Sequence, residues 1–137
     1  MGTTAQKTRK EIDAENGLHP RALIQYINFS GITVPSINQR YGINRKTGTM
    51  FLQADYRAFR DRIAASVHSR IDPPQRVQIT WQTYHDIDNA IKAILDGLVA
   101  GGCIEDDRTV QELVVSKFPC RRGEKNTLDI TVETIAG

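Results

Sequence analysis

The sequence predicts an α+β domain, in which a small mixed β-sheet of about four strands carries two main helices packed on it. Two kinds of periodicity lead to this prediction. Residues 76–83 and 128–133 alternate apolar and polar side chains, as half-buried strands do. Residues 54–69 and 88–100 place apolar side chains three or four residues apart, which is the spacing of a helix buried on one side. Because strands and helices are mixed along a chain of 137 residues, we expect one domain with a single core.

The N-terminal half supplies the first strand and the first helix. Residues 1–20 are polar and lack periodicity, so we expect a flexible N-terminal extension over residues 1–21 and a single domain over 22–137. A strand is expected within 23–30, where Ile, Tyr and Phe are frequent. A basic loop follows over 31–45, and a short extended piece over 50–52.

The expected helix 54–69 carries Phe59, Ile63 and Val67 on one face, with Tyr56 adjoining. Asp72-Pro73-Pro74 then breaks the chain before the alternating strand 76–83, in which we expect Trp81 to belong to the core.

The second helix, its boundaries and the last two strands complete the fold. Asp88 or Asn89 is a suitable N-cap, and Gly101-Gly102 is a suitable stop. Residues 109–118 are rich in Val and Leu and are expected to form a strand, and 128–133 alternate as a final strand.

Composition excludes several classes of protein. No apolar run approaches the roughly 20 residues that a membrane-spanning helix needs, and no apolar signal-peptide core is present at the N-terminus. Cys103 and Cys120 are the only cysteines, which argues against a disulfide framework or a zinc site and for a reducing compartment. We therefore expect a cytoplasmic protein with no membrane partner.

Charge is distributed unevenly along the chain. Residues 36–70 hold seven basic residues against two acidic ones, whereas residues 86–107 hold six acidic residues against Lys92 alone. An acidic segment between basic flanks suits a metal-dependent enzyme that acts on a polyanion, because carboxylates bind the metal and basic residues bind phosphates. The same clusters also fit ordinary solvated faces.

The acidic segment contains a candidate divalent-metal site. Asp86 and Asp88 are two residues apart after a strand, so in an extended link their carboxylates point the same way. A third carboxylate from Glu105, Asp106 or Asp107 completes the site if the chain after Gly101-Gly102 folds back. Lys92 is one helical turn after Asp88 and can stabilise charge on a phosphate.

Each of these residues also has a purely structural interpretation. Asp88 can be a simple helix cap, and Lys92 can be a surface lysine paired with Asp88 or Asp96. Asp106-Asp107 can be a solvated turn or the cap of a short helix.

The combination of motifs resembles the RusA family of Holliday junction resolvases. Asp86-x-Asp88-Asn89-x-x-Lys92, the helical Asp96-Gly97-Leu98 and the later Asp106-Asp107 match the family's pattern. The segment from Pro35 to Tyr41 is similar to the family's Pro-x-x-Asn-x-x-Tyr loop, and the resemblance covers roughly residues 26–132.

The resemblance implies a homodimeric, phage- or prophage-derived endodeoxyribonuclease that resolves four-way junctions by paired nicking in DNA recombination and repair, with Mg²⁺ or Mn²⁺. It assigns the metal-binding carboxylates to Asp86, Asp88 and Asp107, and the essential lysine to Lys92. Asp106 ranks below Asp107. Two alternatives stay open, namely a non-cleaving module that binds branched nucleic acid and a Mg²⁺-dependent phosphohydrolase of small esters. We expect DNA-backbone contacts from the basic residues of two turns and one strand: Arg40, Arg45, Lys46, Lys117, Arg121, Arg122 and Lys125.

Overall fold

The computed structural model describes residues 19–32, 41–43, 46–47, 50–52, 54–83, 90–121 and 123–135. Its central element is a four-stranded sheet in the order β2-β8-β6-β7. β2 (Ile24–Ser30) and β6 (Gln75–Thr83) both pair antiparallel with β8 (Thr127–Thr134), whereas β7 (Val110–Pro119) pairs parallel with β6. The expected mixed sheet of about four strands is therefore confirmed.

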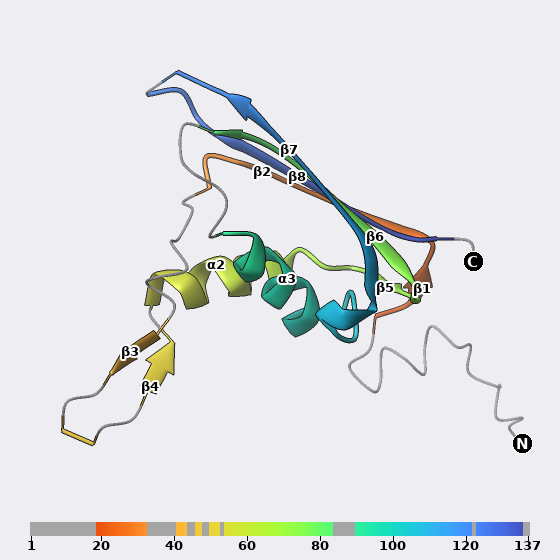
Figure 1. Ribbon diagram of the computed structural model, residues 1–137, viewed down its shortest axis with the longest axis horizontal. Coiled ribbons are helices and arrows are strands. Elements are labelled where there is room, and N and C mark those ends of the chain that lie inside the picture. The colour runs from red at the N-terminus through yellow and green to blue at the C-terminus, as the bar shows by residue number, and fades with distance from the viewer. Residues whose placement is uncertain are drawn as a thin grey trace, which may run out of the picture.

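Two helices lie side by side on one face of this sheet (Figure 1). α2 (Ala54–Ala65) and α3 (Ile91–Ala100) pack against each other, and α3 connects the parallel strands β6 and β7. A parallel pair needs such a crossover, because its second strand must start at the same end as the first. The α+β class predicted from the sequence is confirmed.

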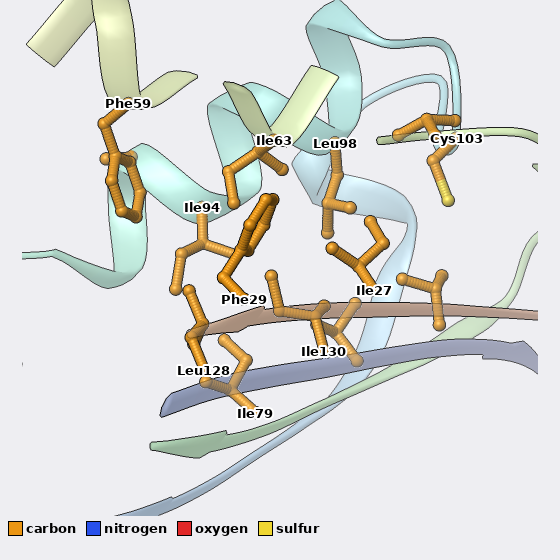
Figure 2. Packing of buried hydrophobic residues seen from close by; sticks show 14 of the residues in the cluster. Ile27, Phe29, Phe59, Ile63, Ile79, Ile94, Leu98, Cys103, Leu128 and Ile130 are labelled. Atoms are coloured by element: carbon orange, nitrogen blue, oxygen red, sulfur yellow. The ribbon is translucent and has the colours of Figure 1, made fainter. Parts of the chain in front are cut away.

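The core lies between the helices and the sheet (Figure 2). Ile27, Ile130 and Ile79 stand next to one another across three strands and are all buried. Phe59 and Ile63 of α2 and the residues Ile94 and Leu98 of α3 cover this row from above. Trp81 is also fully buried and stacks on Phe59 with ring centroids 6.5 Å apart, which confirms its expected place in the core.

The two helices approach each other closely at two glycines, Gly97 within α3 and Gly101 at its C-cap. A Cβ atom at Gly97 would lie 2.5 Å from Cβ of Ile63 and 3.0 Å from the carbonyl oxygen of Arg60. A Cβ atom at Gly101 would lie 2.7 Å from the carbonyl oxygen of Ala64. Because these two residues carry no side chain, α3 packs directly on the backbone of α2.

One predicted helix boundary was wrong. α2 ends at Ala65 rather than Ser69, although Val67 is buried in the chain that follows and so preserves the apolar spacing. α3 begins at Ile91 with Ala90 in the N-cap position and no side-chain cap, and the predicted caps Asp88 and Asn89 lie outside the described residues.

Four short strands form two further sheets that are separate from the main one. β3 (Tyr41–Ile43) lies in the segment predicted as loop and pairs antiparallel with β4 (Met50–Leu52), the extended piece that the sequence did predict. β1 (Arg21–Ala22) pairs parallel with β5 (Arg70–Ile71), so Arg21 belongs to a strand although the prediction placed it in the extension. Within the described ranges, no helix has both the length and the apolar character needed to cross a bilayer.

Candidate active site

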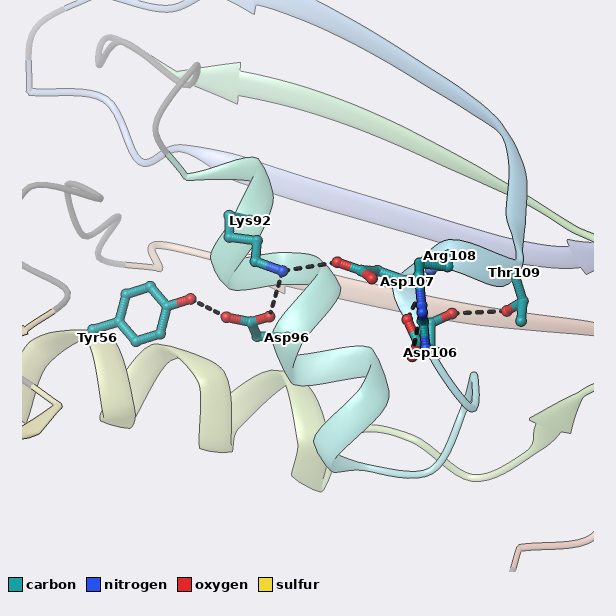
Figure 3. A network of polar contacts seen from close by, with 7 residues as sticks. All are labelled: Tyr56, Lys92, Asp96, Asp106, Asp107, Arg108 and Thr109. Carbon is teal, nitrogen blue, oxygen red and sulfur yellow. Dashed lines mark hydrogen bonds and ion pairs between the residues drawn. The ribbon is translucent and has the colours of Figure 1, made fainter.

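Lys92 lies between two carboxylates on the side of α3 that faces the start of β7 (Figure 3). Its Nζ atom is 2.7 Å from Oδ2 of Asp107 and 3.3 Å from Oδ1 of Asp96. The pair with Asp96 is the i, i+4 pair that the sequence offered as an alternative role for Lys92. The contact with Asp107 joins residues far apart along the chain, as the predicted site requires.

The chain between α3 and β7 doubles back because two glycines end the helix. Gly102 has φ +80°, a left-handed conformation that favours glycine, and its amide donates to the carbonyl of Val99 at 3.0 Å. Cys103 and Ile104 then turn into the core, where both are buried. This anchored turn places the 3-10 helix η2 (Asp107–Thr109) beside α3 and carries Asp107 to Lys92.

The adjacent carboxylates Asp106 and Asp107 interact with each other, but their basic partners differ. Asp106 is the N-cap of η2, where its side chain accepts from the amide of Arg108 at 2.9 Å. The guanidinium of Arg108 also contacts Asp106 at 2.9 Å, and together these donors hold the pKa of Asp106 well below its usual range. Asp106 is therefore engaged in the turn itself, while Asp107 extends toward α3.

Tyr56 of α2 adds a member to this network that sequence reasoning missed. Its ring is buried and its hydroxyl donates to Oδ2 of Asp96. The sequence placed Tyr56 beside the apolar face of its helix. A buried tyrosine hydroxyl needs a polar partner, so a tyrosine next to an apolar helix face was the feature of the sequence that could have indicated this contact. The hydrogen bond leaves the other oxygen of Asp96 facing Lys92.

The network combines a fixed geometry with access to solvent. The side chains of Lys92 and Asp107 are 37% and 34% exposed, so a substrate can reach both. The hydrogen bond to Asp107 is the main cause of the raised pKa of Lys92, and Asp96 adds to it. Lys92 is thus a stable cation at neutral pH, suited to a phosphate oxygen.

Asp86 and Asp88 lie outside the described residues, in the segment that joins the end of β6 at Thr83 to Ala90. Among the described residues, no group of three His, Cys, Asp or Glu side chains gathers to hold a metal. Within the described part of the predicted site, Asp107 supplies the kind of ligand that Mg²⁺ prefers, a partly exposed carboxylate. Its chemistry fits the expected metal.

Some of the predicted DNA-binding residues lie among the described residues and others do not. Arg40, Arg45 and Arg122 lie outside the described residues. The others are exposed: Lys46, Lys117, Arg121 and Lys125. The last three lie at the end of β7 and in its connection to β8, which gives this end of the sheet a basic character.

Two comparisons with known proteins agree with each other. A family model described as "Endodeoxyribonuclease RusA" matches residues 74–133, which run from the start of β6 through α3 and β7 into β8. The crossover junction endodeoxyribonuclease RusA of Escherichia coli O139:H28 (strain E24377A / ETEC) is 31% identical over 106 residues. That alignment covers 71% of this chain and 87% of the relative.

Proposed function

The chain belongs to the RusA family of endodeoxyribonucleases, and from this membership we propose that it resolves Holliday junctions by symmetric paired nicking. The observation that best supports the proposal is the contact between Lys92 and Asp107. It brings the lysine and the third carboxylate of the family's pattern together from separate elements. Both side chains are open to a substrate.

We propose that Asp86, Asp88 and Asp107 hold Mg²⁺, with Mn²⁺ as a substitute. When bound, the ion would supply a Lewis acid for the scissile phosphate and a water of lowered pKa. Lys92 would then contact a phosphate oxygen and stabilise the negative charge that develops there. Asp96 and Tyr56 would hold the ammonium in place.

The basic residues around the two turns would hold the DNA backbone without reading its sequence. We propose that two copies act on one junction, because a four-way junction offers two equivalent strands and a homodimer offers two equivalent sites.

Cleavage of a synthetic mobile four-way junction tests the function, with linear duplex of the same sequence as control. We expect paired nicks in opposed arms with Mg²⁺ or Mn²⁺, no nicks in EDTA, and an intact duplex. Asp86→Asn and Asp88→Asn should each abolish cleavage while the junction is still bound. Tight binding without cleavage under either metal would instead identify a non-cleaving binding module, and activity confined to small phosphate esters would identify a phosphohydrolase.

A further inference from the structure

The segment between α3 and β7 is attached at both of its ends to one residue, Ile71 of β5. At its start, the carbonyl of Cys103 accepts from the amide of Ile71 at 2.9 Å. At its end, Thr109 reaches Ile71 through the buried side chain of Gln75. Gln75 Nε2 donates to the carbonyl of Ile71 at 3.0 Å, and Gln75 Oε1 lies 2.7 Å from the hydroxyl of Thr109. Asp107 lies between these two attachments, so they limit where its carboxylate can be.

The amide of Gln75 can be oriented in only one way. The carbonyl of Ile71 is an acceptor, so the amide nitrogen of Gln75 must face it and the amide oxygen is left facing Thr109. The hydroxyl of Thr109 is therefore the donor to Gln75. The carbonyl of Asp106 also lies 2.7 Å from this hydroxyl (Figure 3), but it accepts from the amide of Thr109 at 3.2 Å and does not depend on the hydroxyl proton.

Gln75 is completely buried, which is an unusual place for an amide side chain. It is 0% exposed, whereas most glutamines lie at the surface. A buried amide without hydrogen bonds destabilises the fold, and an apolar side chain of similar size would fill the same space without that cost. An apolar side chain would, however, fix no direction. The amide of Gln75 is therefore better explained by the way it orients its two partners than by the surface it buries.

The start of β7 is irregular at the same point. Between Gln75 and Arg76, the pairing of β6 with β7 skips one residue of β7, Gln111. Such a bulge bends its strand, and bulges are common next to active sites because they redirect side chains. Because η2 immediately precedes β7, the bulge and the side chain of Gln75 both set the direction of the segment that carries Asp107.

We propose that Gln75 and Thr109 are positioning residues that hold Asp107 in place for the metal. They would act through the backbone of η2, which brings Asp107 to within 2.7 Å of Lys92 Nζ. A metal site needs its ligands at set distances and directions, so a loosened η2 should weaken metal binding while the domain stays folded. The inference deepens the proposed function and rests on it for the role of Asp107 as a metal ligand.

The metal affinity of the protein alone is the first test. Thr109→Val removes the hydroxyl and keeps the shape of the side chain, and Gln75→Met removes the amide and keeps most of its length. Each should raise the Mn²⁺ dissociation constant at least fivefold, in titrations followed by electron paramagnetic resonance without DNA. Thr109→Ser keeps the hydroxyl and should stay within about twofold of wild type. The double variant should be no worse than either single one, because both changes break the same connection.

Gln25→Met is the matched control. Gln25 is also buried, at 6% exposed, and its Oε1 atom accepts from the amide of His68 at 2.8 Å. This contact ties β2 to the chain after α2 rather than to η2. Gln25→Met should lower the urea midpoint of unfolding about as much as Gln75→Met and leave the Mn²⁺ dissociation constant unchanged. The control thereby separates a general loss of stability from a loss of position.

Amide hydrogen exchange tests the connection itself, without metal or DNA. The amides of Ile71 and Thr109 donate to the carbonyls of Cys103 and Asp106, so they are protected while the segment is attached. Thr109→Val should speed the exchange of both amides at least tenfold relative to wild type, and Gln25→Met should not.

Unchanged Mn²⁺ affinity in Thr109→Val and Gln75→Met would overturn the inference even if exchange became faster, because the connection would then be purely structural. Unchanged exchange in Thr109→Val, an equal loss of affinity in Gln25→Met, or a wild-type protein that binds no Mn²⁺ would overturn it as well. A protein whose Mn²⁺ affinity responds as expected, but that cuts no four-way junction, would contradict the proposed function and leave the positioning role supported.

Discussion

Lys92 interacts with two carboxylates that have different roles, and one of them is held by Tyr56. Asp96 is held by the Tyr56 hydroxyl, whereas Asp107 comes from a separate turn and is partly exposed. Lys92 contacts both, so its ammonium is directed by one fixed and one accessible carboxylate. We infer that Asp96 positions the lysine and that Asp107 faces the substrate.

Asp107→Asn should lower junction cleavage at least a hundredfold and leave junction binding equal or tighter. The amide removes a charged metal ligand and also removes a negative charge that repels phosphate. Single-turnover cleavage and gel-shift titration measure the two effects. Asp106→Asn is the matched control and should lose less than tenfold in cleavage, because Asp106 interacts with Arg108. A larger loss for Asp106→Asn than for Asp107→Asn would reverse the assignment.

Asp106 should contribute to stability in a pH-dependent way. Its pKa is lowered in the folded protein, so the folded state favours the ionised carboxylate. The contribution is therefore present above the ordinary aspartate pKa of about 4 and is lost as the pH falls through the lowered value. We expect Asp106→Asn to lower the urea midpoint at pH 6 more than at pH 3. An equal decrease at both pH values would argue against the ionic role.

At the scale of the elements, α3 illustrates what periodicity can and cannot predict. Its apolar stripe predicted the helix and its buried face, and Gly101-Gly102 predicted its end. The helix begins at Ile91, and the capping residues predicted for it, Asp88 or Asn89, lie outside the described residues. α2 was predicted too long because the buried Val67 continues the apolar spacing beyond the end of the helix. At that end the last turn tightens into i, i+3 hydrogen bonds, such as the one from the amide of Ser66 to the carbonyl of Ile63. β3 is too short to show any periodicity.

Gly97→Ala should destabilise the protein by about 1–3 kcal/mol, because the new methyl would collide with Ile63 and the backbone of α2. Urea unfolding measures the loss. Intrinsic helix propensity alone predicts the opposite sign, a gain of about 1 kcal/mol. Ala100→Gly, at the exposed last residue of the same helix, isolates the propensity effect and should cost less than about 1 kcal/mol, the value for a helix interior. A Gly97→Ala variant more stable than wild type would show that the helices are not held in this close contact.

At the scale of the whole molecule, the fold collects parts of the site that lie far apart in the sequence. Sequence reasoning made a fold-back after Gly101-Gly102 the condition for a third carboxylate to join the site, and the chain does turn back there far enough to bring Asp107 to Lys92. The sequence could not assign Tyr56 to the network, because that contact depends on how the two helices cross. The positions predicted for Asp86 and Asp88 stay predictions, as do the contacts of the basic residues with DNA.

Arg121→Ala combined with Lys125→Ala should weaken junction binding and flatten its dependence on salt. Each phosphate contact contributes about 0.9 to the slope of log K against log salt, so losing two should reduce the slope by about 2. Fluorescence anisotropy over a range of salt concentrations measures this. Glu124→Ala, in the same exposed turn, is the control and should not reduce the slope. An unchanged slope in the double variant would place the DNA surface elsewhere.

The buried Cys103 lies in the turn that carries Asp107, so the reactivity of its thiol can report when this turn opens. Burial raises the pKa of its thiol to about 12, so in the folded protein at neutral pH it is neither ionised nor accessible to alkylating reagents. Cys120 is only partly buried and should react first. In the Cys120→Ser variant, the rate at which Cys103 is alkylated would then measure how often this turn opens. If Gly97→Ala loosens the packing of α3, that rate should rise, so one thiol would report the lifetime of the arrangement that brings Asp107 to Lys92.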